Sequence, residues 1–383
     1  MKKRLLFLFI MSTFVVGTVE LIIAGILELV ASDLHISESL SGQLITIYAF
    51  SFAIGAPILS VKTAKLERKK VLLTSLLIFI VSNIISALST SYLMLAIVRV
   101  ITALSAAVFI VVVLSTAAKL ADPAKQGRIL GLVYMGFSAA NVFGVPAGTY
   151  VGVAFGWRST FWLIATLSII CFVLIMILLP KTEGEQEASK IKMTSAFKNQ
   201  QVMALLSITT ILLAAHYIVY SYISPLMTNA GHSLSAVSFI LLLAGIAGTI
   251  GTSAGGSASD IFGPKKSLLV ACIVFSLMML LLRVSLPFIF LFSVIVFIWN
   301  FVQWSTNPAI QYALIHINPR ASELALSLNM SALNIGIGLG ALIGGIIIEQ
   351  DGLLYAPFIS AAMVIIPIVL LRYVRGEKEV ANE

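Results

Sequence analysis

Charged residues are scarce in this sequence. Only 10% of its 383 residues are charged, whereas 60% are hydrophobic and the mean hydropathy is +1.07. A soluble domain has no need of such a composition, and the apolar runs are long enough to cross a bilayer. The composition therefore excludes a soluble globular protein and predicts an integral membrane protein.

Cysteine is almost absent. The two cysteines, Cys171 and Cys272, both lie inside apolar stretches. Their spacing matches neither a disulfide framework nor a metal site. We therefore expect two buried small side chains and no bound metal.

Motifs of enzyme chemistry are missing too. The sequence has no glycine-rich loop with a following lysine that would hold nucleotide phosphates, so ATP hydrolysis is not expected. No Ser-His-Asp or metal-ligand constellation is evident either. We expect no enzymatic activity and no bound cofactor.

What the sequence does contain is a series of apolar spans, each near or above the ~20 residues that cross a bilayer as a helix. We expect an all-α membrane protein with twelve transmembrane helices in two six-helix halves. The expected spans are residues 5–31, 42–61, 71–89, 92–118, 129–152, 159–179, 201–228, 235–258, 266–286, 287–316, 323–348 and 354–374.

Lysine and arginine predict the topology. Of the 24 such residues, 21 fall in the termini and in the loops on one side of the expected membrane. This bias places both termini and the basic loops in the cytoplasm. The net charge of +8 then belongs to loops at the membrane surface, so the expected partner is the lipid bilayer and not nucleic acid. The first apolar run continues to Val30, which is too long for a signal peptide, and we interpret it as a retained span.

An offset of 196 positions relates the two parts of the chain, because it takes Gly144 to Gly340 and Gly148 to Gly344. The only long polar stretch between spans separates six spans from six. We expect halves at 1–180 and 201–383, joined by a cytoplasmic linker at 181–200. Tandem halves in a polytopic membrane protein indicate a transporter that binds its substrate between them.

Small residues mark the stretch from Gly131 to Gly152. Gly144, Gly148 and Gly152 recur at every fourth position, so they share a helix face that another helix can approach closely. Pro146 removes a backbone hydrogen bond and is expected to bend this helix.

Few ionisable side chains lie deep in the spans. A carboxylate as deep as Glu20 must be protonated, paired or facing a cavity, and we favour a functional role over a permanently protonated, structural acid. Glu28 lies near the end of the same span, where solvent or headgroups can reach it. Arg99 keeps its proton, so it either holds the structure or acts electrostatically in coupling. His216 is either a core residue or a contact for substrate or proton.

Aromatic and amide side chains gather in later spans. Tyr217 and Tyr220 follow His216 and share a face. A polar stripe in the tenth span comprises Asn300, Gln303, Trp304, Asn307 and Gln311. Hydrogen bonding between helices would explain such a stripe, but we favour a central cavity for a flat, neutral, hydrogen-bonding solute. The asparagines that we expect to complete this cavity are Asn141, Asn329 and Asn334.

Several motifs resemble the major facilitator superfamily. Residues 256–266, GSASDIFGPKK, resemble its cytoplasmic signature between the second and third spans of a half. The residues that carry this likeness are Gly256, Asp260, Gly263 and Lys265. The first-half copy, SVKTAKLERKK at 60–70, is degenerate, with Ala64 and Glu67 at the Asp and second Gly positions. A first-half gating salt bridge built on that Asp is therefore in question.

Further motifs narrow the resemblance from the superfamily as a whole to a group of exporters within it. Arg99 in LAIVRVITALSAA resembles the family's span-four arginine, although Ala103 replaces the usual glycine. Residues 143–152, FGVPAGTYVG, with Gly144, Pro146 and Gly148, resemble the span-five motif of proton-driven exporters. The stretches TVELIIAGIL, GQLITIYAFSFAIGAPIL, TAKLERKK, AHYIVYSYISPLM and WSTNPAIQYALI resemble bacterial arabinose-efflux-type exporters, most of all those of purine bases and nucleosides.

The resemblance implies proton-coupled efflux of a small flat organic solute by alternating access, driven by the proton gradient. Glu20 is favoured over His216 as the proton carrier, with Arg99 acting on it. A broad-spectrum drug/proton antiporter is the alternative, and a transporter-like membrane sensor is the rival from another class. We expect a monomer in the bacterial cell membrane.

Overall fold

The computed structural model describes residues 3–63, 65–120, 129, 132–133, 136–137, 139–183, 199–317, 322–350 and 352–374. Every regular element in these ranges is a helix. Eleven helices in them are long and apolar enough to cross a membrane, and a shorter apolar helix covers Val142–Phe155. The all-α membrane fold expected from the sequence is thereby confirmed.

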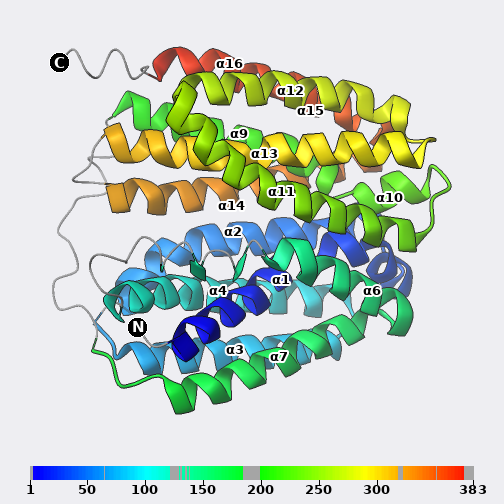
Figure 1. Ribbon diagram of the computed structural model, residues 1–383. Coiled ribbons are helices and arrows are strands. Elements are labelled where there is room, and N and C mark those ends of the chain that lie inside the picture. The colour runs from blue at the N-terminus through cyan, green and yellow to red at the C-terminus, as the bar shows by residue number, and fades with distance from the viewer. Residues whose placement is uncertain are drawn as a thin grey trace. The chain divides into compact units, whose positions relative to one another are not determined.

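The first unit of the chain is Met1–Ser189 together with Leu234–Leu242. Its described helices are α1 (Lys3–Leu34), α2 (Glu38–Thr63), α3 (Arg68–Ala87), α4 (Tyr92–Leu120), the π-helical turn η2 (Ala140–Gly144), α6 (Val145–Phe155) and α7 (Trp157–Leu178). Helix α3 packs against α4 and α7 (Figure 1), while α1 packs against α2, α4, α6 and α7. Helix α1 therefore contacts most of the other helices of its unit.

The second unit comprises Lys190–Ser233 and Leu243–Glu383. Its described helices are α9 (Gln200–Tyr220), α10 (Ile223–Thr228), α11 (Leu234–Phe262, whose first residues group with the first unit), α12 (Pro264–Ser285), α13 (Ile289–Ile317), α14 (Ser322–Glu349), η4 (Leu353–Tyr355), α15 (Ala356–Met363), α16 (Ile365–Leu370) and η5 (Leu371–Tyr373). Helix α9 packs against α13, α14 and α15. Like α1 in the first unit, it therefore contacts several other helices of its unit.

Prolines divide two of the expected spans. The sequence predicts one span over 201–228, but the helix ends at Tyr220 and resumes at Ile223. Pro225 has no amide hydrogen to donate to the carbonyl of Ser221, four residues earlier, which explains the interruption.

The last span is divided in the same way. It is predicted over 354–374, but the helix breaks at Val364. Pro367 cannot donate to the carbonyl of Met363, so the α-helical ladder stops there. The chain nevertheless remains helical and apolar on both sides of the break.

The helix around Pro146 departs from α geometry. Residues Ala140–Gly144 form the π-helical turn η2 directly before α6. Pro146 has no amide hydrogen to donate to the carbonyl of Val142, and a wider turn accommodates the lost hydrogen bond. The distortion expected at this proline thus takes the form of a π turn that ends two residues before it.

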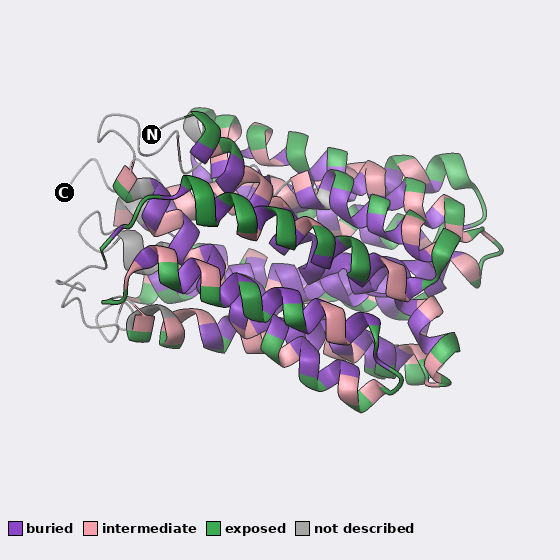
Figure 2. Ribbon diagram, turned by 90° about the horizontal axis from the view of Figure 1, so that it is seen from below, coloured by how far each residue is buried: buried purple, intermediate pink, exposed green. Residues whose placement is uncertain are grey.

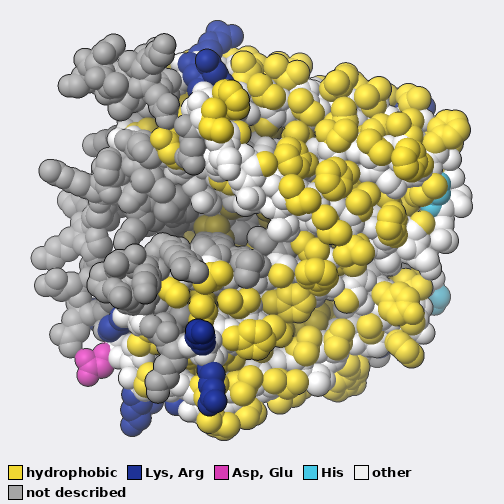
Figure 3. Space-filling model, in the orientation of Figure 1, with side chains coloured by type: hydrophobic (Ala, Val, Ile, Leu, Met, Phe, Trp, Pro, Cys, Tyr) yellow, Lys and Arg dark blue, Asp and Glu magenta, His cyan; other side chains and the backbone are white. Residues whose placement is uncertain are grey.

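The outward sides of the helices are apolar. Large exposed side chains include Phe155, Ile261 and Phe290, which are 77%, 72% and 82% exposed. Exposed and buried residues alternate around the helices in Figure 2, and hydrophobic side chains cover much of the face shown in Figure 3. A water-facing surface does not carry so continuous an apolar cover, so these sides fit contact with lipid.

The small-residue face of the first unit packs on α1. A Cβ atom placed on Gly144 would lie 3.0 Å from Cβ of Thr18, and one placed on Gly148 would lie 2.6 Å from Cδ1 of Ile22. The backbones of the two helices approach this closely because no side chain separates them. The close approach predicted from the sequence is therefore made, and the partner is the first helix.

The second unit repeats this packing. A Cβ atom on Gly340 would lie 2.5 Å from the carbonyl oxygen of Ala214, and one on Gly344 would lie 2.7 Å from that of Ile218. Both glycines are on α14 and both partners on α9. These partners stand 196 positions after Thr18 and Ile22, so the offset found in the glycines extends to the residues that they contact.

A hydrogen bond follows the same offset. Thr13 on α1 donates from Oγ1 to the carbonyl oxygen of Val133 at 2.8 Å. In the second unit, Thr209 on α9 donates from Oγ1 to Oδ1 of Asn329 at 2.7 Å. Each residue of the second pair is 196 positions after its counterpart. Thr13 and Thr209 therefore stand at equivalent positions, and each joins its own helix to the equivalent helix of its unit.

Candidate substrate and proton sites

Glu20 lies in the middle of α1 and is 5% exposed. Arg99 of α4 reaches the same level and is completely buried. Its Nη1 donates to the carbonyl oxygen of Val19 at 2.9 Å, and its Nη2 donates to the carbonyl oxygen of Glu20 at 3.4 Å. The guanidinium thereby joins α4 to the backbone of α1 beside the acid.

Tyr48 of α2 packs against Arg99. The Cζ atom of Arg99 is 4.4 Å from the centre of the Tyr48 ring, and Tyr48 in turn stacks on Phe52 at 6.3 Å. In the described ranges, neither the hydroxyl of Tyr48 nor Nε of Arg99 has a hydrogen-bond partner, although both atoms are buried. Three helices thus bring an acid, a cation and a phenol to one level of the first unit.

Aromatic rings surround His216 in the second unit. Its ring stacks on that of Tyr220 at 5.0 Å and meets the ring of Tyr217 edge-on at 5.1 Å, both on α9. From α13, Trp299 lies at 4.8 Å and Trp304 at 6.5 Å between ring centres. The sequence-predicted residues His216, Tyr217, Tyr220 and Trp304 are therefore brought together in one cluster.

Trp299 is the member of this aromatic cluster that the sequence did not reveal. It is completely buried and also contacts Phe275 of α12, at 6.5 Å between ring centres. A search for polar residues passes over a tryptophan in an apolar helix, but Trp299 lies four residues before Gln303 and so shares its face. That spacing was the available signal.

Polar atoms without partners lie on the two helices of this cluster, α9 and α13, and on α14, which packs against α9. In the described part of the chain, Nδ1 of His216, Nε1 of Trp299, Oε1 of Gln303 and Oδ1 of Asn334 are buried and accept or donate no hydrogen bond. Leaving such an atom unpaired costs about 1–3 kcal/mol. The cluster therefore offers flat apolar faces together with unused donors and acceptors.

The predicted amides divide into two groups. Asn300 and Asn334 each donate to a carbonyl of their own helix, at 2.9 and 3.2 Å. Asn307 instead accepts from Gln311 at 3.3 Å and from Asn329 of α14 at 3.4 Å. Asn307 thus takes part in a hydrogen bond between α13 and α14. The side chain of Asn141 lies outside the described residues.

The signature after α11 adopts a backbone that needs glycine. Gly263 has φ +78° and directly precedes α12, and this left-handed conformation strains residues with a side chain. Glu67 precedes α3 at the equivalent position with φ −57°. The glycine lost from the first copy is thus not required by its backbone. Gly256 lies in α11 and Lys265 in the first turn of α12, whereas the side chain of Asp260 lies outside the described residues.

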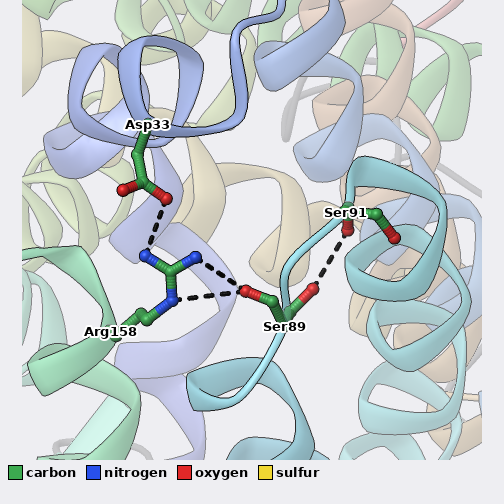
Figure 4. A network of polar contacts seen from close by, with 4 residues as sticks. All are labelled: Asp33, Ser89, Ser91 and Arg158. Carbon is green, nitrogen blue, oxygen red and sulfur yellow. Dashed lines mark hydrogen bonds and ion pairs between the residues drawn. The ribbon is translucent and has the colours of Figure 1, made fainter.

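A polar network ties helix ends together elsewhere in the first unit (Figure 4). Nη1 of Arg158 donates to Oδ2 of Asp33 at 2.7 Å. Nη2 and Nε of Arg158 both donate to the carbonyl oxygen of Ser89, at 2.8 and 3.2 Å. The guanidinium also lies 4.3 Å from the ring centre of Trp157. One side chain at the start of α7 thereby connects the ends of α1 and α3.

Comparison with known proteins identifies the family. The model of the Major Facilitator Superfamily matches residues 8–322 and again residues 206–383. The chain belongs to the Major Facilitator Superfamily. As a member of this superfamily it is a multi-pass membrane transporter, not an enzyme. The second match begins close to the start of the second unit.

Relatives in this superfamily align over nearly the whole chain. An uncharacterized MFS-type transporter of Bacillus subtilis (strain 168), YbcL, is 34% identical over 93% of this chain and 92% of its own. A probable sugar efflux transporter of Pasteurella multocida (strain Pm70) is 29% identical over 94% of this chain and 90% of its own.

Solved structures share the superfamily's fold. A D-xylose-proton symporter superposes with a TM-score of 0.78 at 14% identity, covering 97% of this chain and 98% of its own. A bacterial homolog of the human lysosomal transporter Spinster, in an inward-facing and unoccupied conformation, gives a TM-score of 0.77 at 14% identity, covering 98% of each chain. At this identity the likeness concerns the fold alone.

Proposed function

We propose that this transporter exports a small, flat, hydrogen-bonding organic solute in exchange for protons, by alternating access. Purine bases, nucleosides or their analogues are the favoured substrates. The observation that carries this proposal is the aromatic cluster around His216. Its rings present flat faces, and its helices hold buried polar atoms without partners in the described ranges.

The chemistry of the cluster favours a heteroaromatic solute. A base stacked on an aromatic side chain gains about 1–3 kcal/mol in nucleic-acid sites. The Trp299 N–H is a donor, and the Gln303 carbonyl is an acceptor. A purine ring carries both donors and acceptors in its plane, so it would satisfy such atoms while it stacks.

Glu20 is the proposed proton carrier. It is the acid in the middle of a membrane helix, and Arg99 binds the backbone beside it. A neighbouring cation favours the charged carboxylate, whereas burial favours the neutral acid. A change in the surroundings of Glu20 would therefore change its protonation. His216 is the second candidate for this role.

The proposed direction of transport and one alternative substrate are supported by a relative of this chain. The Pasteurella relative is named a probable sugar efflux transporter, which supports export and makes a sugar a second candidate substrate. A broad-spectrum drug/proton antiporter is the remaining alternative within the class. A transporter-like sensor would bind a ligand without moving it.

The proposed setting is the bacterial cell membrane. We propose a monomer with halves at 1–180 and 201–383, a linker at 181–200, and both termini in the cytoplasm, as the distribution of lysine and arginine indicates. The partners are a small-molecule substrate and the bilayer, and the driving force is the proton gradient.

The test is transport by the purified protein in vesicles. Ligands that raise its melting temperature are first selected from purines, nucleosides, sugars and drugs, because a ligand that prefers the folded state stabilises it. Counterflow and efflux of these ligands are then measured with and without an imposed pH gradient. We expect purine movement that the gradient accelerates. Binding without counterflow would favour a sensor, and selective movement of sugars or of diverse drugs would reassign the substrate.

A further inference from the structure

The level of Glu20 in the first unit contains two buried donors that the observed hydrogen bonds leave unused. Arg99 uses Nη1 and Nη2 on backbone carbonyls of α1, and its Nε–H has no partner in the described ranges. The hydroxyl of Tyr48 is equally unused. The guanidinium of Arg99 packs on the ring of Tyr48, and each of these buried side chains holds an unsatisfied donor. Both donors call for an explanation, because each carries a desolvation cost.

The nearest explanation is an acceptor that is present in only one state of the protein. Such an acceptor must be strong, since Nε–H of a guanidinium and a phenol O–H both bond best to a carboxylate. Glu20 follows Val19, whose carbonyl Arg99 binds, and its charge acts on both Arg99 and Tyr48. Among the described contacts, however, no hydrogen bond or ion pair joins its carboxylate to either group.

We propose that Tyr48 is a positioning residue of the proton site, whose hydroxyl, with Nε–H of Arg99, binds the Glu20 carboxylate once that group has lost its proton. This inference rests on the proposed proton coupling at Glu20. Deprotonation breaks the carboxyl O–H bond, leaves the electron pair on oxygen and transfers the proton to water. The new carboxylate then accepts hydrogen bonds from the Tyr48 hydroxyl and from Nε–H of Arg99. Reprotonation of Glu20 breaks these two hydrogen bonds.

Other titratable groups near α1 are engaged elsewhere. On α7, Arg158 binds Asp33, and Cys171 interacts with Ser12. On α6, Tyr150 is 66% exposed. The remaining titratable side chains of α2 and α4 lie toward the ends of those helices: Glu38, Lys62, Tyr92 and Lys119. Arg99 and Tyr48 are thus the described groups that act on Glu20.

The experiment is an infrared titration of the purified protein in lipid. The carboxyl band of Glu20 is defined as the one that disappears in Glu20→Gln, and its intensity is followed against pH. Tyr48→Phe keeps the ring under Arg99 and removes only the hydroxyl. A hydrogen bond to the charged carboxylate favours deprotonation, so its loss should move the midpoint upward by about 1 to 2 pH units. The control Tyr150→Phe, at an exposed position, should leave the midpoint unchanged.

Thermal stability provides a second readout. Below the midpoint the hydroxyl has no partner, so Tyr48→Phe should leave the melting temperature unchanged or raise it. Above the midpoint the variant lacks a bond to the carboxylate and should melt earlier than the unaltered protein. A tyrosine with a merely structural role would lower the melting temperature equally at both pH values, which would overturn the proposal.

The outcomes also separate this inference from the proposed function. An unshifted midpoint in Tyr48→Phe, or no titrating Glu20 band, would overturn the role of Tyr48. If the midpoint shifts as expected but Glu20→Gln retains full proton-driven efflux, the Tyr48 contact stands and the proposed coupling through Glu20 fails.

Discussion

His216 occupies in the second unit the position that Glu20 occupies in the first. The two residues are 196 positions apart, and the glycine contacts that flank them follow the same offset, at Thr18 and Ala214 before them and at Ile22 and Ile218 after them. One unit therefore places an acid beside an arginine at this level, and the other places an imidazole among aromatic rings.

This difference predicts separate effects on transport. Glu20→Gln should abolish proton-driven efflux while binding and substrate exchange persist, because the amide cannot exchange a proton. His216→Gln should mainly weaken binding, since it removes a ring from the aromatic cluster. Both are measured in vesicles under an imposed pH gradient, with Glu28→Gln, near the end of the same helix, as the control. Full efflux by Glu20→Gln beside an inactive His216→Gln would move the proton to His216.

Trp304 should contribute to binding by stacking. Trp304→Ala is expected to weaken the affinity for purines about 5- to 150-fold, which corresponds to ~1–3 kcal/mol for one stacked base. The half-exposed Trp162 on α7 supplies the control, and Trp162→Ala should bind normally. Isothermal titration of the purified variants measures both. Normal purine binding by a folded Trp304→Ala protein would place the site elsewhere.

Trp299 should contribute through its N–H. Trp299→Phe keeps an aromatic ring against His216 and removes the donor. One neutral hydrogen bond contributes about 0.5–1.5 kcal/mol, so we expect an affinity loss of about 2- to 13-fold for ligands with an in-plane acceptor. Ligands without that acceptor should lose less. Equal losses for both kinds of ligand in the same titration would assign Trp299 a packing role only.

Three glycines should differ in their tolerance of alanine. Gly340→Ala places a methyl group against backbone, at 2.5 Å from a carbonyl oxygen, whereas the nearest atom to Gly148→Ala is the mobile end of Ile22. Overpacking costs about 1–3 kcal/mol, so Gly340→Ala should lower the melting temperature more. Gly256 has open space, with its nearest neighbour at 4.0 Å, and Gly256→Ala should be neutral or slightly stabilising. An equal effect of all three substitutions would contradict the packing described.

Arg158 should matter more to stability than its acidic partner does. The ion pair with Asp33 is partly exposed, at 35% and 43% of the side chains, and such pairs contribute about 0–1 kcal/mol. Asp33→Asn should therefore change the melting temperature little. Arg158→Ala also removes the two hydrogen bonds to Ser89 and the contact with Trp157, and should lower it clearly. A larger effect of Asp33→Asn would show that charge dominates.

The sequence predicted most of the helical spans that the structure describes, and the 196-residue offset between glycines, because both depend on local patterns. The predicted span at 129–152 lies partly outside the described residues. Apolar length defines a membrane helix, and glycines spaced by four define a packing face. Which helix packs against that face depends on the tertiary structure. Nothing in the sequence around Gly144 indicates that it contacts Thr18. The breaks beside Pro225 and Pro367 were missed although their cause is local, because the apolar pattern continues through them.

The candidate site was predicted in part for a similar reason. Polar residues in apolar helices are conspicuous, so His216 and the amides stood out. Trp299 did not, since an apolar helix readily accommodates tryptophan. The partner of Arg99 was also beyond prediction, because the side chain binds backbone carbonyls, and these leave no trace in the amino-acid sequence.

One contact between helices shows what the two units have in common although their sequences differ. In the first unit a Cβ atom placed on Gly17 would lie 3.2 Å from Cβ of Ala140, and in the second unit one placed on Gly336 would lie 2.7 Å from Cβ of Leu213. The pairs are related by the same offset, but the glycine has changed helices. What is inherited is then the gap between two backbones and not the residue at either position. Substitutions here should be acceptable only in pairs, so the two sides of this contact are expected to covary among relatives.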